Sequence, residues 1–183
     1  DPSSVKIKRK IIIGGKAAPG YDMAKNIIRL FYVLGRKIHN DPVACEHLRI
    51  VYVENYNVAK AEVIIPAADL SEQISTASME ASGTSNMKLS MNGALTIGTD
   101  DGANVEMRQA VGDDNWPFLF GYSSDEVTKI KAEGTHNPDQ ILTEYEEIYQ
   151  AMEMLRNGSL AENEIEDEVL KSIYKSLMEG ENR

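Results

Sequence analysis

The sequence predicts an α/β protein in which short parallel strands are joined and covered by helices. Two apolar runs rich in β-branched residues, at 11–13 and 48–53, lie on either side of a segment with helical periodicity. A strand, a helix and a second strand in that order form a unit whose strands run parallel, with a crossover that is nearly always right-handed. The order of these three segments is the basis of the predicted fold class.

The first strand is expected at 11–13, where three isoleucines lead into a turn at Gly14 and Gly15. Such a run is typical of a buried parallel strand followed by a turn. The basic run at 6–10 favours a solvated strand edge, with a phosphate patch as the alternative. The loop at 14–20 has neither the Walker spacing nor GxGxxG, so nucleotide binding is not supported.

The helix and second strand follow directly. Apolar residues at spacings of three and four predict an amphipathic helix over 21–39, and Asn-Asp-Pro at 40–42 ends it. The second strand is expected at 48–53. Tyr56 then lies just beyond its carboxyl end, where ligands bind in open α/β sheets, so it is a candidate ligand contact. The alternative is a core or rim position.

The segment 80–107 carries the strongest chemical signal. Ser-Gly-Thr-Ser at 82–85 can begin a helix, whose unpaired N–H groups and dipole hold an anion. Lys88 follows one turn later, and helical side chains lean back toward that end. An aldehyde that carries a phosphate would fit, and pyridoxal phosphate is such a molecule. The same pattern is also typical of a plain helix cap and a solvated lysine.

The remaining elements follow from apolar periodicity and turn residues. Asp-Asp-Gly-Ala-Asn at 100–104 is interpreted as a turn and helix cap, because it lacks the twelve-residue calcium-loop pattern. Strands are predicted at 93–98 and 116–121, and helices at 58–65, after 100–104, after 123–126, at 139–156 and at 164–178. The residues at 180–183 are expected to be a frayed end.

Composition excludes several classes of function. A net charge of −10 argues against a general nucleic-acid binder, and no apolar run approaches the ~20 residues that span a bilayer. A single cysteine excludes an internal disulfide and favours a reducing compartment, the cytoplasm. The three histidines lie far apart, so no metal site is expected. The chain starts at Asp1 without an initiator methionine, like a cut piece.

The segment 80–107 closely resembles the pyridoxal-phosphate lysine segment of the glycogen, starch and maltodextrin phosphorylases. The resemblance rests on EASGTSNMK at 80–88 and NGALTIGTDDGANVEM at 92–107. It extends to GGKAAPGYDMAK at 14–25 and IIPAADLSEQIS at 64–75. Glu-Asn-Tyr at 54–56 also matches, and the likeness is dense from about residue 11 to residue 107.

This resemblance implies a fold and a parent enzyme. The chain would be a single partial domain, 1–183, of the Rossmann-like C-terminal domain of a two-domain GT-B-type glycosyltransferase. Its α/β cofactor-binding core would be 1–122, and 123–183 would be mostly helical and acidic. The parent α-glucan phosphorylase would transfer a terminal α-1,4-glucosyl unit to inorganic phosphate, releasing glucose 1-phosphate. It would be a cytoplasmic homodimer.

The resemblance also implies roles for individual residues. Lys88 would be the catalytic-site lysine that anchors pyridoxal 5′-phosphate as a Schiff base. Gly83, Thr84 and Ser85 would supply N–H groups to the cofactor phosphate, and Tyr56 would contact the cofactor. Sugar hydroxyls would be bound by Glu80, Ser82 and Gly83. For Glu80, a first-turn acid that favours the helix dipole is the alternative.

Two positions depart from the family pattern, and one loop gains a role from it. Asn57 stands where many members carry arginine, and Ser85 replaces a glycine found in many members. Lys16 lies in a loop that faces the cleft in this family, so it is a further candidate.

The isolated chain would be inactive, because the cationic residues that bind substrate phosphate precede Asp1 and the N-terminal domain is missing. The alternatives are a nucleotide-sugar glycosyltransferase without pyridoxal and a non-catalytic scaffold domain.

Overall fold

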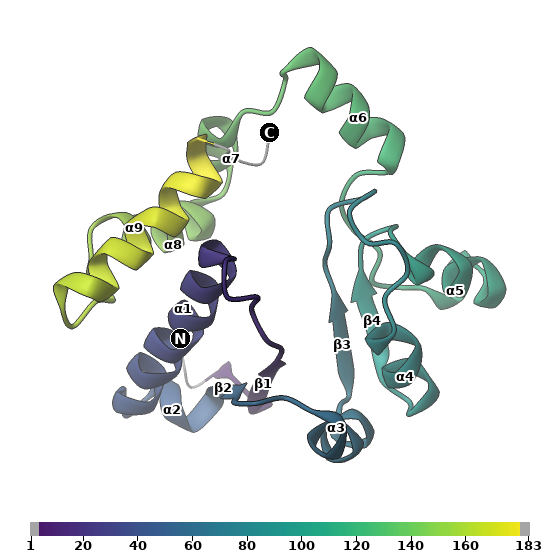
Figure 1. Ribbon diagram of the computed structural model, residues 1–183, viewed down its shortest axis with the longest axis horizontal. Coiled ribbons are helices and arrows are strands. Elements are labelled where there is room, and N and C mark those ends of the chain that lie inside the picture. The colour runs from purple at the N-terminus through teal and green to yellow at the C-terminus, as the bar shows by residue number, and fades with distance from the viewer. Residues whose placement is uncertain (1–3, 180–183) are drawn as a thin grey trace. The chain divides into compact units, whose positions relative to one another are not determined.

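The computed structural model describes residues 4–179; the expected frayed end at 180–183 and the first three residues lie outside them. The chain is α/β and divides into two compact units (Figure 1). The first unit holds the residues up to Tyr56 and those from Asn137 onward, and the second is Asn57–His136. The predicted α/β class is confirmed. The grouping into a single domain, with a core at 1–122 and a helical part at 123–183, stays a prediction.

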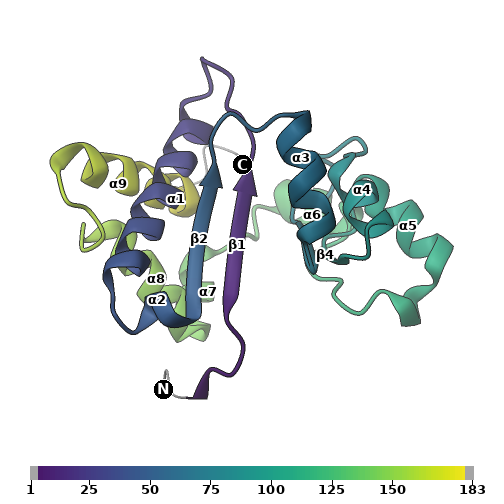
Figure 2. The ribbon, with the colours of Figure 1, turned by 90° about the horizontal axis from the view of Figure 1, so that it is seen from below.

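The first unit contains the predicted strand–helix–strand segment (Figure 2). Strand β1 (Arg9–Gly14) pairs in parallel with β2 (Leu48–Val53). They are joined by α1 (Asp22–Asn40) and the short α2 (Ala44–His47). Helix α1 approaches β2 closely, since a side chain at Gly35 would lie 2.9 Å from the carbonyl oxygen of Ile50. These strands and the helix are therefore confirmed.

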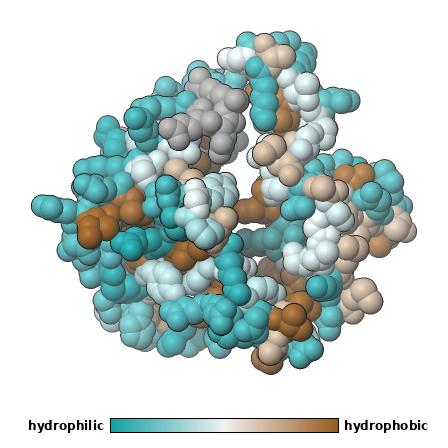
Figure 3. Space-filling view, in the orientation of Figure 1, coloured by the Kyte–Doolittle hydropathy of each residue, from teal (hydrophilic) through white to brown (hydrophobic). Residues whose placement is uncertain are grey.

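The prediction that the first strand is buried is wrong for this chain. Ile12 of β1 and its partner Val51 of β2 are each 47% exposed, and Ile11 is 38% exposed. Within the described residues the sheet has two strands, and α1 packs against it on the side of Ile50. The side chains of Ile12 and Val51 stay largely exposed. Figure 3 shows apolar residues, in brown, at several places on the molecular surface.

The core of the first unit lies where α1 meets the C-terminal helices. These are α7 (Pro138–Glu144), α8 (Glu146–Arg156) and α9 (Glu164–Glu179). The core residues are Val33, Met152, Leu155, Leu160, Leu170 and Ile173. The single helix predicted at 139–156 is wrong, because Tyr145 has an extended backbone (φ −125°, ψ 98°) that separates α7 from α8.

The second unit contains the segment with the strongest chemical signal. Its strands β3 (Leu70–Gln73) and β4 (Leu95–Gly98) pair in parallel. Its helices are α3 (Val58–Ile64), α4 (Ser85–Met91), α5 (Ala103–Val111) and α6 (Ser124–Glu133), with 3₁₀ turns at Ile65–Ala67 and Asp113–Asn115. Among the helices between residues 4 and 179, none combines the length and apolar character needed to cross a bilayer.

Two predictions for the second unit had different outcomes. The predicted cap after 123 is confirmed, because Ser123 and Glu126 form a reciprocal capping box at the start of α6. The short strand and turn predicted at 116–121 is reduced, within the described residues, to a single bridge between Gly98 and Leu119.

The interior of the second unit is largely polar. Its buried polar residues are Ser71, Asn86, Thr96, Thr99, Asp101 and Asn104. Its buried apolar residues are Ala77, Ala94, Ala103 and Trp116. Because three of these four are alanines, hydrogen bonds between defined donors and acceptors have a large part in fixing this unit. Buried polar groups that are fully paired specify a unique arrangement.

Candidate functional site

The candidate site is built on α4, which begins at Ser85 as the small residues before it predict. The N–H of Lys88 donates to the carbonyl oxygen of Thr84 at 3.2 Å, so the lysine lies one helical turn beyond the N-cap. Lys88 is exposed in this chain. Its amine is therefore accessible, and its flanking residues Met87 and Leu89 do not bury it.

The backbone just before α4 is suited to an anion. Gly83 has φ +76°, a conformation that L side chains rarely adopt. Within the described residues, the N–H groups of Gly83, Thr84 and Ser85 donate to no protein acceptor. Three unpaired donors in succession, one turn before an accessible amine, fit a group that carries both a phosphate and an aldehyde. The hydroxyl of Ser85 donates to Gln73 Oε1 at 3.3 Å.

The predicted sugar contacts lie beside these donors. Glu80 and Ser82 are exposed, and the N–H of Ser82 donates weakly to Glu80 Oε1 at 3.4 Å. The hydroxyl of Ser82 donates to the carbonyl oxygen of Gly83 at 3.1 Å. The alternative reading of Glu80 as a first-turn acid is wrong, because α4 starts five residues later.

A buried carboxylate that sequence reasoning missed holds this segment. Asp101 is 6% exposed and accepts hydrogen bonds from Ser75 Oγ (2.8 Å), Ser78 N (2.9 Å) and Glu80 N (2.9 Å). Burial alone would raise the pKa of Asp101, but hydrogen bonds, chiefly from the N–H of Glu80, outweigh it and hold the pKa below its usual value. The sequence places Asp101 only in a turn and helix cap. The helix α5 does begin at Ala103, but its N-cap is Gly102 and no side chain caps it. An acid before a helix is ordinary there, so no local signal distinguishes it.

A second buried pair fastens α4 to α5. Asn86 Nδ2 donates to Asn104 Oδ1 at 3.0 Å, and Asn104 Nδ2 donates to the carbonyl oxygen of Thr99 at 3.0 Å. Both asparagines are almost completely buried. The helix of Lys88 is thereby tied to the turn that carries Asp101.

Tyr56 belongs to the first unit and lies at the carboxyl ends of its strands. Its ring covers Gly14, where an added Cβ would lie 2.6 Å from Tyr56 Cδ2. Beside it, the hydroxyl of Tyr52 donates to the carbonyl oxygen of Gly15 at 2.6 Å. Tyr56 is half-buried, which agrees with a rim position, and its contact with a cofactor stays a prediction.

The other two positions singled out in the sequence, Lys16 and Asn57, have ordinary structural roles. Lys16 is exposed in the loop between β1 and α1. Asn57 caps α3, since its side-chain oxygen accepts from the N–H of Lys60 at 3.2 Å. Asparagine is favoured at such a cap, which gives it a local structural role.

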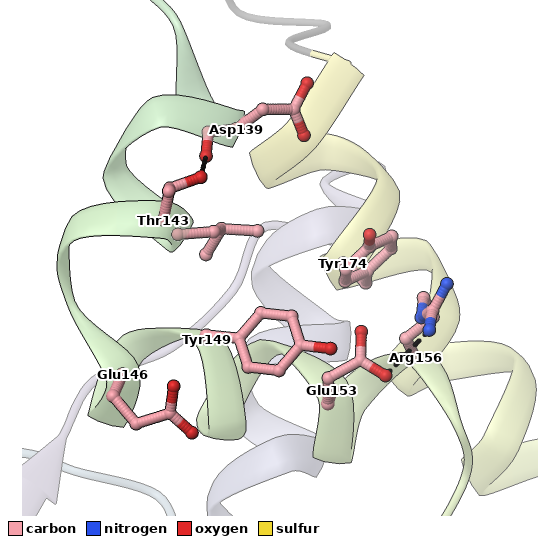
Figure 4. A pocket seen from close by; sticks show the side chains of 8 residues that line it. Asp139, Thr143, Glu146, Tyr149, Glu153, Arg156 and Tyr174 are labelled. Carbon is pink, nitrogen blue, oxygen red and sulfur yellow. Dashed lines mark hydrogen bonds and ion pairs between the residues drawn. The ribbon is translucent and has the colours of Figure 1, made fainter.

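A separate surface hollow of about 500 Å³ lies among α7, α8 and α9 (Figure 4). Its lining includes Tyr149, Tyr174 and the ion pair between Arg156 and Glu153 (2.7 Å). None of the predicted site residues lines it. Between residues 4 and 179, no group of acidic, histidine or cysteine side chains is arranged to hold a metal ion.

The known proteins that resemble this chain match nearly all of its length. The family described as carbohydrate phosphorylase matches residues 1–183. The chain is 47% identical to the muscle form of glycogen phosphorylase from Homo sapiens and 46% identical to that from Oryctolagus cuniculus, over 97% of its length. It is 45% identical to the brain form from Rattus norvegicus over the same share. The chain spans about a fifth of the length of each of these relatives.

Proposed function

The chain belongs to the carbohydrate phosphorylase family, and on that basis we propose that it is part of an α-glucan phosphorylase. The whole protein transfers a terminal α-1,4-linked glucosyl unit from the glucan to inorganic phosphate and releases glucose 1-phosphate. The observation that carries this proposal is identity of 45–47% to glycogen phosphorylases over 97% of the chain. The whole protein is a cytoplasmic homodimer, whose N-terminal domain completes the active-site cleft.

The residues around α4 hold pyridoxal 5′-phosphate in this proposal. Lys88 would hold the cofactor through its amine, and the N–H groups of Gly83, Thr84 and Ser85 would hold its phosphate. The ring of Tyr56 contacts the cofactor. When bound, the cofactor would supply its phosphate group, which assists proton transfer and charge stabilisation beside the substrate phosphate.

Glu80, Ser82 and Gly83 bind the hydroxyls of the glucosyl unit. An ionised carboxylate accepts hydrogen bonds on both oxygens, which suits neighbouring hydroxyls on a sugar ring. The exposed carboxylate of Glu80 supports this assignment. These contacts orient the anomeric carbon toward the attacking phosphate, and orientation is a large part of catalysis in such a reaction.

The test is chemical trapping of the cofactor on the full-length protein that contains this chain. We expect borohydride to fix pyridoxal on Lys88, as mapped by mass spectrometry, and Lys88→Arg to abolish the label together with glucose 1-phosphate formation. Lys171→Arg is the matched control, because Lys171 is also a helical lysine and pairs with Asp167. Pyridoxal on other lysines only, or none at all, would instead favour a glycosyltransferase that needs no pyridoxal or a scaffold protein.

A further inference from the structure

The backbone that carries Glu80 and Ser82 is fastened at two neighbouring points to the turn after β4. Asp101 accepts a hydrogen bond from the N–H of Glu80 at 2.9 Å. Two residues later, the N–H of Ala103 donates to the carbonyl oxygen of Ser82 at 2.7 Å. Two of the three residues that are proposed to contact the sugar, Glu80 and Ser82, are therefore held through their own main chain.

The side chain at position 101 has to accept hydrogen bonds on both of its oxygens. Oδ1 receives the N–H of Ser78, and Oδ2 receives the N–H of Glu80 and the hydroxyl of Ser75. A carboxylate accepts on both oxygens, whereas an amide of the same shape presents an NH₂ group to one of these donors. Ser78 has φ +77°, so the bond to its N–H also holds an unfavourable turn.

We propose that Asp101 is a positioning residue for glucosyl recognition, because it holds the main chain on which Glu80 and Ser82 meet the sugar hydroxyls. The inference rests on the proposed phosphorylase function. Asp101 acts only through the backbone at 78–82, since its carboxylate is buried and its described acceptor sites are occupied by protein donors.

The helix of Lys88 is fastened by a different side chain. It is tied to α5 through the bond between Asn86 and Asn104, at 3.0 Å. Among the described contacts of Asp101, none reaches α4. Loss of the carboxylate should therefore weaken sugar recognition and leave pyridoxal on Lys88.

The experiment compares Asp101→Asn with Asp100→Asn in the full-length enzyme. Asp100 is the adjacent acid, but it pairs with Arg108 at 3.1 Å and has no described bond to the segment 75–83. Three quantities are measured for each: borohydride-trapped pyridoxal per chain, kcat/KM for glucose 1-phosphate, and kcat/KM for its monodeoxy analogues.

We expect Asp101→Asn to lower kcat/KM for glucose 1-phosphate by about 10- to 100-fold, the effect of a misplacement near 1 Å, with trapped pyridoxal unchanged. Asp100→Asn should stay within about twofold of the unsubstituted enzyme. Where removal of one sugar hydroxyl lowers kcat/KM for the unsubstituted enzyme, the same removal should lower kcat/KM much less for Asp101→Asn. The contact to that hydroxyl is already weakened in the variant, so the two losses are not additive.

Equal losses of kcat/KM in both variants would overturn the inference. It would also be overturned if Asp101→Asn lowered kcat/KM by the same factor for every deoxy analogue. Loss of trapped pyridoxal in Asp101→Asn would also overturn it, since the role would then be general folding. If the unsubstituted enzyme traps no pyridoxal and forms no glucose 1-phosphate, the proposed function itself fails, and that result is seen without any variant.

Discussion

Gly102 marks a close approach of two backbone segments beside the candidate site. It has φ +53°, and a Cβ there would lie 2.6 Å from the carbonyl oxygen of Ser82. That oxygen also accepts the 2.7 Å hydrogen bond from Ala103, so it has little freedom to move aside. Position 102 therefore needs glycine for two reasons, backbone conformation and space.

These two reasons can be separated with a matched pair of substitutions. Gly112 also has a positive φ (+84°), but a Cβ there would meet nothing within 4 Å. Gly112→Ala should cost about 1–3 kcal/mol for backbone strain. Gly102→Ala should cost a similar strain energy and about 1–3 kcal/mol more for overpacking. Urea unfolding of the chain measures both variants. Similar unfolding midpoints for the two variants would mean that Ser82 moves away freely.

At the scale of elements, the sequence predicts a strand correctly where its own residues are distinctly β-branched or apolar. The β-branched run at Leu48–Val53 and the apolar run before Gly98 became β2 and β4. Strand β3, Leu70–Gln73, was missed because Leu-Ser-Glu-Gln has neither β-branched residues nor a clear alternation. Its pairing with β4 makes it a strand, and that partner lies 25 residues away at Leu95.

The packing of α1 on α9 depends on a charged contact as well as on the apolar core. Arg36 donates to both carboxylate oxygens of Glu166, at 3.0 and 2.7 Å, and Glu166 is 8% exposed. The Arg36 guanidinium is the main reason that the pKa of Glu166 is lowered from 4.5 to about 2. Bidentate pairs of this kind are stronger than ordinary surface ion pairs.

This pair predicts a specific acid sensitivity of the first unit. A carboxyl whose folded pKa is depressed contributes stability above its unfolded pKa, here 4.5, and loses it as the pH falls toward about 2. The contribution is on the order of 3 kcal/mol at neutral pH. Glu166→Gln should remove it and flatten the dependence of unfolding free energy on pH between about 4.5 and 2.

Glu162→Gln is the control for that titration. Glu162 also pairs with Arg36, at 2.9 Å, but its side chain is 47% exposed, so it should contribute at most about 1 kcal/mol. Urea titrations at several pH values measure both variants. An unchanged pH dependence in Glu166→Gln would show that the pair does not stabilise the α1–α9 contact.

At the scale of the whole molecule, the candidate site divides into a local part and a long-range part. The spacing of Gly83 and Lys88 is local, so the sequence predicts both the helix start and the one-turn separation. The role of Asp101 is not local, because its donors lie 21 to 26 residues earlier. The exposure of Ile12 and Val51 in the first sheet was missed for a similar reason, since apolar content predicts burial without indicating which residues provide it.

The isolated chain should bind at most the parts of substrate and cofactor that these residues touch, and it should not catalyse. Lys88 and Glu80 are exposed, so water competes for both. Preorganised charge stabilisation is strong only where water is excluded. We expect no phosphorolysis of maltoheptaose by this chain with added pyridoxal phosphate, measured as glucose 1-phosphate, while the full-length enzyme turns over and its Lys88→Arg variant does not. Turnover by the chain within about tenfold of the full-length rate, about 1.4 kcal/mol in barrier, would mean that these residues suffice.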